Sequence, residues 1–154
     1  MPKDLQTFLP TIILRHRREN LKKCSLRGLE TRSDMQFYTY PKKAPPTLAN
    51  YILLDLNGPP LTKEDSHLGL FLIDGTWDRA KTMIKSIKEP LITRSLPANI
   101  KTAYPRRQLS CDDPERGLAS IEALYIAYHI LGLDTTGLFD RYHWKSIFLE
   151  INNL

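Results

Sequence analysis

Short apolar runs alternate with amphipathic stretches along the whole chain, and this alternation predicts strands separated by helices. The apolar runs are rich in β-branched and aromatic residues and end at turn-forming residues, which is typical of strands. We expect strands at 11–16, 35–41, 51–56, 68–74 and 91–97. The run at 68–74 is apolar on both faces, which indicates a central strand covered by helices on either side.

Helical periodicity marks three longer segments. After the fourth predicted strand, one helical stripe carries Trp77, Ala80, Ile84 and Ile87. A second helix is expected over 118–131, with Gly132 as its stop, and a last amphipathic stretch occupies 135–154.

Two shorter helices follow from capping signals. Ser25 is the expected N-cap of a short helix within 24–32, and Thr62 with Asp65 three residues later comes close to a capping box. The 97–117 segment has no clear periodicity, and an irregular segment of this length is unusual in a compact domain unless it is functional. The whole pattern predicts one α/β domain over 1–154.

Composition narrows the class of protein. The chain is 42% hydrophobic and 25% charged, which is ordinary for a folded protein and argues against disorder. No apolar run approaches the roughly 20 residues that span a bilayer, and the start of the sequence does not resemble a secretory signal. Cys24 and Cys111 lie far apart, which is neither a disulfide framework nor a metal-ligand spacing. We therefore expect a cytoplasmic protein with no membrane contact.

The charge is uneven along the chain. The net charge is +5, yet residues 1–50 alone hold ten Lys/Arg against four Asp/Glu. The densest basic clusters are 15–23 and 104–108. Such clusters favour a polyanionic partner, because Lys and Arg bind phosphates and release counterions. The alternative is a solvated face that only keeps the protein soluble.

Asp74 ends the most apolar strand, and Gly75, Thr76 and Trp77 follow it directly. In α/β sheets, ligands bind beyond the carboxyl ends of the strands, so a carboxylate there can transfer protons or bind a cation. Gly75 would let the backbone approach a ligand, and Trp77 would form a flat wall. The alternative is that Asp74 caps the helix and Trp77 belongs to the core; spacing alone does not decide between them.

The stretch "LFLIDGTWDRA" resembles the DTW-domain superfamily, whose signature is Asp-x-(Thr/Ser)-Trp after an apolar strand. Four further segments are similar to the same family in the same order, between about Thr11 and Asn152. "ILRHRRENLKKCSLRGL" matches it at His16, Glu19, Ser25 and Leu29; "GLASIEALYIA" matches it at Leu118, Ser120, Glu122 and Ala123. "LLDLNGPPLTKED" and "YHWKSIFLEINN" resemble its branch that modifies small-subunit rRNA.

Some positions depart from the family pattern. The cysteine cluster that precedes the domain in many tRNA enzymes of the family is missing, so we expect no metal. Ala119 stands where the family usually has Ser. "YPRRQ" is more like the branch that modifies tRNA, so both rRNA and tRNA remain candidate targets.

The resemblance implies a SPOUT-like fold, an α/β sheet flanked by helices with a C-terminal trefoil knot. It implies an enzyme that uses S-adenosylmethionine to transfer a 3-amino-3-carboxypropyl group to a uridine or pseudouridine of structured RNA. Asp74 would be catalytic, accepting the imino proton or orienting the base, or it would balance the sulfonium charge. The implied cofactor-binding residues are Ser25, Ile73, Asp74, Gly75, Thr76, Trp77, Leu96, Leu118, Ala119 and Ser120.

Structured RNA is the expected partner, with phosphate contacts or base contacts from Arg15, His16, Arg17, Arg18, Lys22, Lys23, Arg106 and Arg107. Glu122 is either a first-turn charge that complements the helix dipole or a functional residue. Two other functions remain open: an RNA methyltransferase with the same cofactor, and a ribosome-assembly factor that binds RNA without chemistry.

Overall fold

The computed structural model describes residues 9–22, 24–105 and 117–154. Its centre is a five-stranded sheet in the order β2-β1-β4-β3-β5, and every paired strand is parallel. The strands are β1 (Thr11–His16), β2 (Met35–Tyr40), β3 (Tyr51–Leu54), β4 (Gly69–Asp74) and β5 (Ile92–Arg94). All five predicted strands are thus confirmed, with β3 and β5 shorter than expected.

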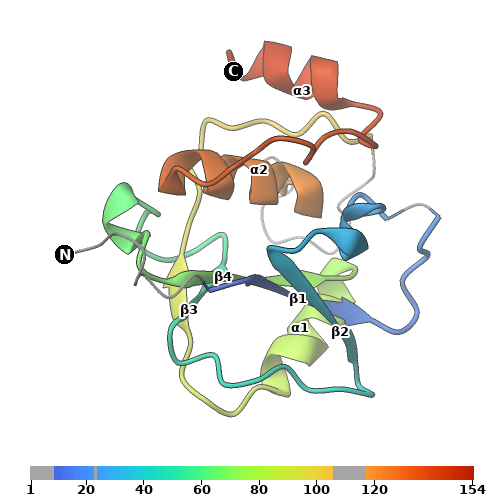
Figure 1. Ribbon diagram of the computed structural model, residues 1–154, viewed down its shortest axis with the longest axis vertical. Coiled ribbons are helices and arrows are strands. Elements are labelled where there is room, and N and C mark those ends of the chain that lie inside the picture. Colours follow the sequence, from blue (N-terminus) through green and yellow to red (C-terminus); the bar gives the residue numbers. More distant parts are fainter. Residues whose placement is uncertain (1–8, 23, 106–116) are drawn as a thin grey trace.

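Helices cover both faces of the sheet (Figure 1). On one face lies α1 (Trp77–Lys85), and on the other lie α2 (Ser120–Leu131) and, beyond it, α3 (Lys145–Ile151). Short 3-10 helices occupy Leu29–Thr31 and Lys63–Asp65. This is the expected α/β architecture of a sheet flanked by helices.

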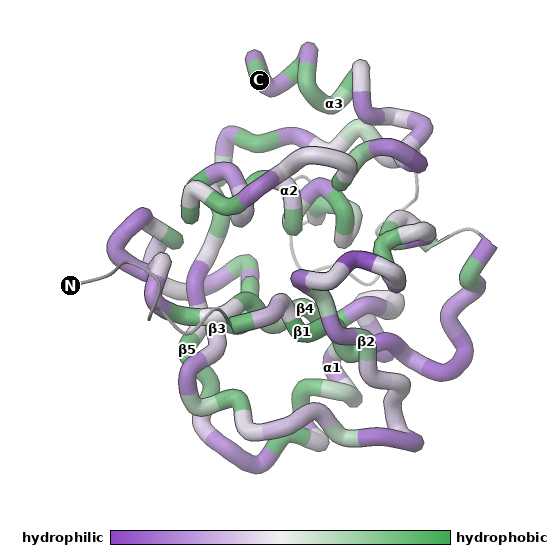
Figure 2. Tube along the Cα trace, in the orientation of Figure 1, coloured by the Kyte–Doolittle hydropathy of each residue, from purple (hydrophilic) through white to green (hydrophobic). Residues whose placement is uncertain are grey.

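Alternation along the strands divides the core into two parts. In β1, Ile13 packs into the cluster that includes α2, whereas Ile12 and Leu14 pack with Met83 of α1. All four side chains are at most 2% exposed. Successive side chains of a strand point to opposite faces, so a strand that is apolar throughout can fill both clusters. In Figure 2, the apolar residues accordingly follow β1 and β4 through the middle of the molecule.

The capping signals in the sequence predicted the helix ends correctly at two of three positions. Gly132 ends α2 in the left-handed conformation, with φ of 73°, and Thr62 with Asp65 forms the expected capping box. The expectation for Ser25 was wrong. The 3-10 helix begins after Gly28, and the Ser25 hydroxyl lies against a different helix, described below.

Within the described part of the chain, no helix is both long enough and apolar enough to cross a membrane.

Candidate functional site

A cavity of about 140 Å³ opens at the carboxyl ends of β3 and β4. Leu53, Leu54 and Leu72 form its apolar floor, and Trp77, Ala80 and Ile84 of α1 form one wall. The opposite wall is built by Leu96, Pro97, Ile100, Leu118, Ser120 and Ala123. The cavity therefore lies between α1, the start of α2 and the chain after β5. This is where parallel α/β sheets usually bind ligands.

The structure brings six of the expected cofactor residues together around this cavity: Ile73, Gly75, Trp77, Leu96, Leu118 and Ser120. They come from three segments far apart in the sequence. The other four, Ser25, Asp74, Thr76 and Ala119, are not among the lining residues. Each of these four has a different structural role.

Thr76 and Trp77 are neighbours in sequence, but Thr76 caps α1 whereas Trp77 lines the cavity. Thr76 is the N-cap of α1, because its Oγ1 accepts a hydrogen bond from the backbone nitrogen of Arg79 at 3.3 Å. Trp77 begins the helix, and its half-buried side chain faces the cavity. The alternative in which Trp77 belongs wholly to the core is therefore wrong, since its side chain is only partly buried and belongs to neither core cluster.

Gly75 lines the cavity through its backbone. A Cβ at this position would lie 3.5 Å from carbon atoms of His16 and Arg79, which is ordinary van der Waals contact. Because that Cβ would point to those side chains, the absence of a side chain at Gly75 opens no additional space for a ligand.

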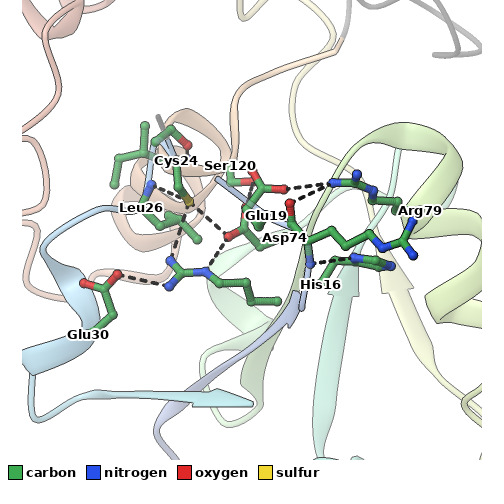
Figure 3. Close-up of polar contacts among 12 residues, drawn as sticks. His16, Glu19, Cys24, Leu26, Glu30, Asp74, Arg79 and Ser120 are labelled. Atoms are coloured by element: carbon green, nitrogen blue, oxygen red, sulfur yellow. Dashed lines mark hydrogen bonds and ion pairs between the residues drawn. The ribbon is translucent and has the colours of Figure 1, made fainter. Parts of the chain in front are cut away.

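Asp74 is held in a buried polar network (Figure 3). Its Oδ2 accepts hydrogen bonds from Nε of Arg15 at 3.0 Å and from Sγ of Cys24 at 3.1 Å. Its Oδ1 accepts one from Oγ of Ser120 at 3.3 Å. Only 3% of Asp74 is exposed. Both carboxylate oxygens are thus occupied by donors from three different segments, and Ser120 is the one that reaches the cavity.

Arg15 is a correction to the sequence-based expectation. It was expected to contact RNA phosphates, but it is only 8% exposed and forms ion pairs with Asp74 at 3.0 Å and Glu30 at 3.1 Å. Burial by itself would lower the pKa of Arg15, but Cys24, Asp74 and Glu30 outweigh it and raise the pKa. The charge of Arg15 is therefore neutralised inside the protein.

Cys24 belongs to the same network. Burial and the negative charge of Asp74 raise the pKa of the Cys24 thiol to about 12. Glu19, Cys24 and Asp74 place one potential metal-ligand atom each within 4.8 Å of one another. However, a protonated thiol and a carboxylate already paired with Arg15 make a poor cation site, because metal ligands must be deprotonated.

Ser25 caps α2 from a distance of 96 positions in the sequence. The N-cap of α2 is Ala119, which has no side-chain acceptor, and Oγ of Ser25 accepts the hydrogen bond from the backbone nitrogen of Ile121 at 3.2 Å. A cap normally comes from the N-cap residue itself. The hydroxyl that is missing at Ala119 is thus replaced by that of Ser25, which stabilises the start of α2.

Glu122 is structural in this arrangement. It is fully buried and accepts hydrogen bonds from Ala119 N, Ala103 N, Thr102 Oγ1 and Tyr142 Oη at 2.6–2.9 Å. Burial and this carboxylate raise the pKa of Tyr142. Glu122 therefore fixes the chain after β5 against α2 and keeps that wall of the cavity in place.

Three of the expected RNA-binding residues are exposed in the described part of the chain. Arg17, Arg18 and Lys22 are exposed in the loop after β1, where hydrophilic residues gather in Figure 2. His16 lies partly buried at the end of β1, and burial together with Arg79, Arg17 and Arg18 lowers its pKa. Lys23, Arg106 and Arg107 lie outside the described residues.

Two further charged residues near the cavity were not among the predicted site residues. Asp55 directly follows β3, whereas Asp74 is the last residue of β4, and Asp55 is an exposed carboxylate in the cavity lining. Arg79 contacts the loop after β1, since its Nη1 donates to the Arg18 carbonyl at 3.4 Å and lies 4.0 Å from Glu19. The predicted strand 51–56 contained Asp55, so no signal marked it as an acid at a strand end, whereas β3 ends at Leu54 in the structure.

Comparison with known proteins identifies a similar enzyme. No family model matches the sequence, and no curated protein matches it. Among solved structures, the chain is similar to one described as the SAM-dependent rRNA:acp-transferase Tsr3 from Vulcanisaeta distributa. The two share 28% sequence identity with a TM-score of 0.71, over 96% of this chain and 80% of that one. The likeness therefore extends over nearly the whole chain.

Proposed function

We propose that this protein is an S-adenosylmethionine-dependent enzyme that transfers a 3-amino-3-carboxypropyl group to a uridine or pseudouridine of rRNA. The observation that carries the proposal is the likeness to an rRNA acp-transferase over nearly the whole chain. The cavity supports it, because it opens at the carboxyl ends of two parallel strands, where such sheets bind ligands.

The residues around the cavity fit this cofactor. Its walls are mostly leucine, isoleucine and tryptophan side chains, which suit an adenine ring and the carbons around sulfur. The face of Trp77 can attract a cation, and Asp55 offers a carboxylate at the same cavity. Ser120 supplies a hydroxyl whose orientation is set by Asp74. An apolar pocket with few, fixed polar groups is what a sulfonium ligand requires.

When bound, S-adenosylmethionine supplies three electrophilic carbons on one sulfonium, and the carbon exposed to the acceptor is the one transferred. Selecting among them is a matter of proximity and orientation, so the shape of the apolar walls would decide which carbon faces the RNA. The side chains that close the cavity would also exclude water from the reacting centre.

The geometry favours an orienting role for Asp74 over proton acceptance. Its carboxylate is 3% exposed and accepts hydrogen bonds from Arg15, Cys24 and Ser120. A general base must come within hydrogen-bond reach of the proton that it accepts. Asp55 is the carboxylate that lines the cavity, so we assign to Asp55 the role of facing the cationic cofactor or the acceptor base.

The finer features implied by the family resemblance also belong to this proposal. We infer a SPOUT-like trefoil knot; its path would involve 97–117, of which 106–116 lie outside the described residues. We further infer that the chain works in the cytoplasm as one domain. A tRNA substrate remains the alternative, and a comparison of tRNA and rRNA acceptors from cells that lack the protein separates the two.

The by-product of the reaction tests the proposal. Purified protein is incubated with S-adenosylmethionine and RNA from cells that lack it, and the small products are identified by mass spectrometry. Methylthioadenosine, together with a nucleoside heavier by the transferred group, is the expected result. S-adenosylhomocysteine would instead indicate a methyltransferase. No turnover, with salt-dependent RNA binding retained, would indicate an assembly factor.

A further inference from the structure

A second hollow lies on the α1 face of the sheet, beside the ends of β1 and β2. Its volume is about 570 Å³. Leu14, Leu48 and Ile87 line it with apolar surface, and the partly exposed ring of Tyr40 adds an aromatic wall. Leu14 and Leu48 are at most 2% exposed, so the floor is part of a packed core rather than a loose surface crevice.

The exposed charged side chains that line this hollow are basic. Lys43 and Lys88 are exposed at its edge, and Lys43 Nζ lies 5.4 Å from the centre of the Tyr38 ring. The acid in the lining, Glu89, already accepts hydrogen bonds from Leu48 N at 2.8 Å and from Thr47 Oγ1 at 3.3 Å. The lining therefore offers apolar and aromatic surface with a positive edge.

The two hollows are built on adjacent strand pairs of the sheet, the first on β3 and β4 and the second on β1 and β2. The strand order places β2 and β1 beside β4 and β3, so the midpoints of the two strand pairs are two strand spacings apart, or roughly 10 Å across the sheet. Basic residues of the loop after β1 lie between them. Arg17 N donates to the Tyr40 carbonyl at 2.9 Å, and Arg79 donates to the Arg18 carbonyl. A chain of phosphates could thus follow positive charge from one hollow to the other.

We propose that the second hollow binds an unpaired nucleotide of the substrate RNA, near the nucleotide that is modified. Its base would lie against Tyr40 and the apolar floor, and its phosphates would contact Lys43, Lys88 and Arg17. A nucleobase matches this lining because it is flat and stacks on aromatic side chains, while its backbone carries the negative charge that the lysines attract. The inference rests on the proposed function, since it takes RNA as the substrate.

Binding of a labelled single-stranded oligouridylate, followed by fluorescence anisotropy, tests the site. Tyr40→Ala is expected to weaken binding on the order of tenfold, whereas Tyr40→Phe keeps the ring and stays near wild type. Lys43→Glu combined with Lys88→Glu should weaken binding and lower its salt dependence. Lys145→Glu in α3, on the opposite face of the sheet, is the matched control and should leave affinity unchanged.

The lysine variants keep the test valid if Tyr40→Ala fails to fold, because both lysines are exposed. Unchanged affinity in folded Tyr40→Ala or in the lysine variants overturns the inference and leaves a protein segment as the occupant. Methylthioadenosine release is measured separately. If the wild type releases methylthioadenosine and these variants bind RNA and react normally, the proposed nucleotide site is wrong and the proposed function stands. If these residues are needed for oligouridylate binding but the wild type releases no methylthioadenosine, the nucleotide site stands and the proposed function is wrong.

Discussion

Arg15 and Asp74 are register partners on neighbouring parallel strands, and their side chains form a buried ion pair at 3.0 Å. Arg15 also donates a hydrogen bond to Glu30. Asp74 accepts a hydrogen bond from Ser120, which lines the cavity. One ion pair therefore connects the loop after β1, the sheet and the start of α2. The acid that looks catalytic in the sequence serves first to assemble the site.

Asp74→Asn should destabilise the fold. The substitution leaves the buried guanidinium of Arg15 with Glu30 as its remaining charged partner, so the loss should lie below the cost of an uncompensated buried charge, which is about 3–5 kcal/mol. Urea unfolding measures this loss as a decrease in the free energy of unfolding, and Asp140→Asn at an exposed site is the control. If the variant were as stable as the wild type and only transfer were slower, Asp74 would be a proton acceptor and the orienting role would be wrong.

The two tryptophans should respond oppositely to truncation. Trp77 lines the cavity, so Trp77→Ala should lower S-adenosylmethionine affinity about tenfold or more with little change in melting temperature. Trp144 packs against the α2 core cluster, so Trp144→Ala should lower the melting temperature and leave the affinity of the folded protein near wild type. Isothermal titration and thermal unfolding separate these effects. A folding defect in Trp77→Ala would return that ring to the core.

Much of the fold could be predicted from the sequence because its signals are local. The apolar run at Gly69–Asp74 and the stop at Gly132 each depend on neighbours within a few positions, and both appear where expected. Trp77 lies three residues after this strand, at the edge where parallel sheets bind ligands, but its spacing left open whether the ring would line the cavity or pack in the core.

The site was less predictable where one residue acts on a distant one. Arg15 looked like an exposed base in a basic cluster, because its partner Asp74 lies 59 positions away and the register of the two strands cannot be read from either segment. Ser25 looked like a local cap for the same reason. Strand pairing and helix docking decide such contacts, and the local pattern does not contain them.

The long-range cap on α2 makes a prediction with a built-in rescue. Ser25→Ala removes the acceptor for the Ile121 backbone nitrogen and should cost about 1 kcal/mol of stability. Ala119→Ser in that background restores a hydroxyl at the true N-cap and should recover part of the loss. Urea unfolding of the single and double variants measures this. If Ser25→Ala instead weakened cofactor binding with no loss of stability, Ser25 would be a ligand residue.

His16 should titrate below its usual pKa of about 6.5. Burial and the positive charges of Arg79, Arg17 and Arg18 lower its pKa, because each disfavours the protonated ring. Above the pKa that His16 has in the unfolded chain, the ring is neutral in both states and its titration does not change stability. As the pH falls from that value toward the lower pKa of the folded state, the unfolded chain binds the proton first, so folding stability is lost. At neutral pH the ring is uncharged, and Nδ1 can accept the hydrogen bond from Arg18 N at 3.1 Å.

Nuclear magnetic resonance of the imidazole protons measures this titration directly. Arg79→Ala removes the largest cause after burial and should raise the midpoint, whereas Lys145→Ala in α3 should leave it unchanged. A midpoint at or above 6.5 in the wild type would contradict the arrangement, because the cations around His16 would then not be close enough to act on it. RNA affinity should likewise show no step from His16 between neutral and mildly alkaline pH, since its ring carries no charge there.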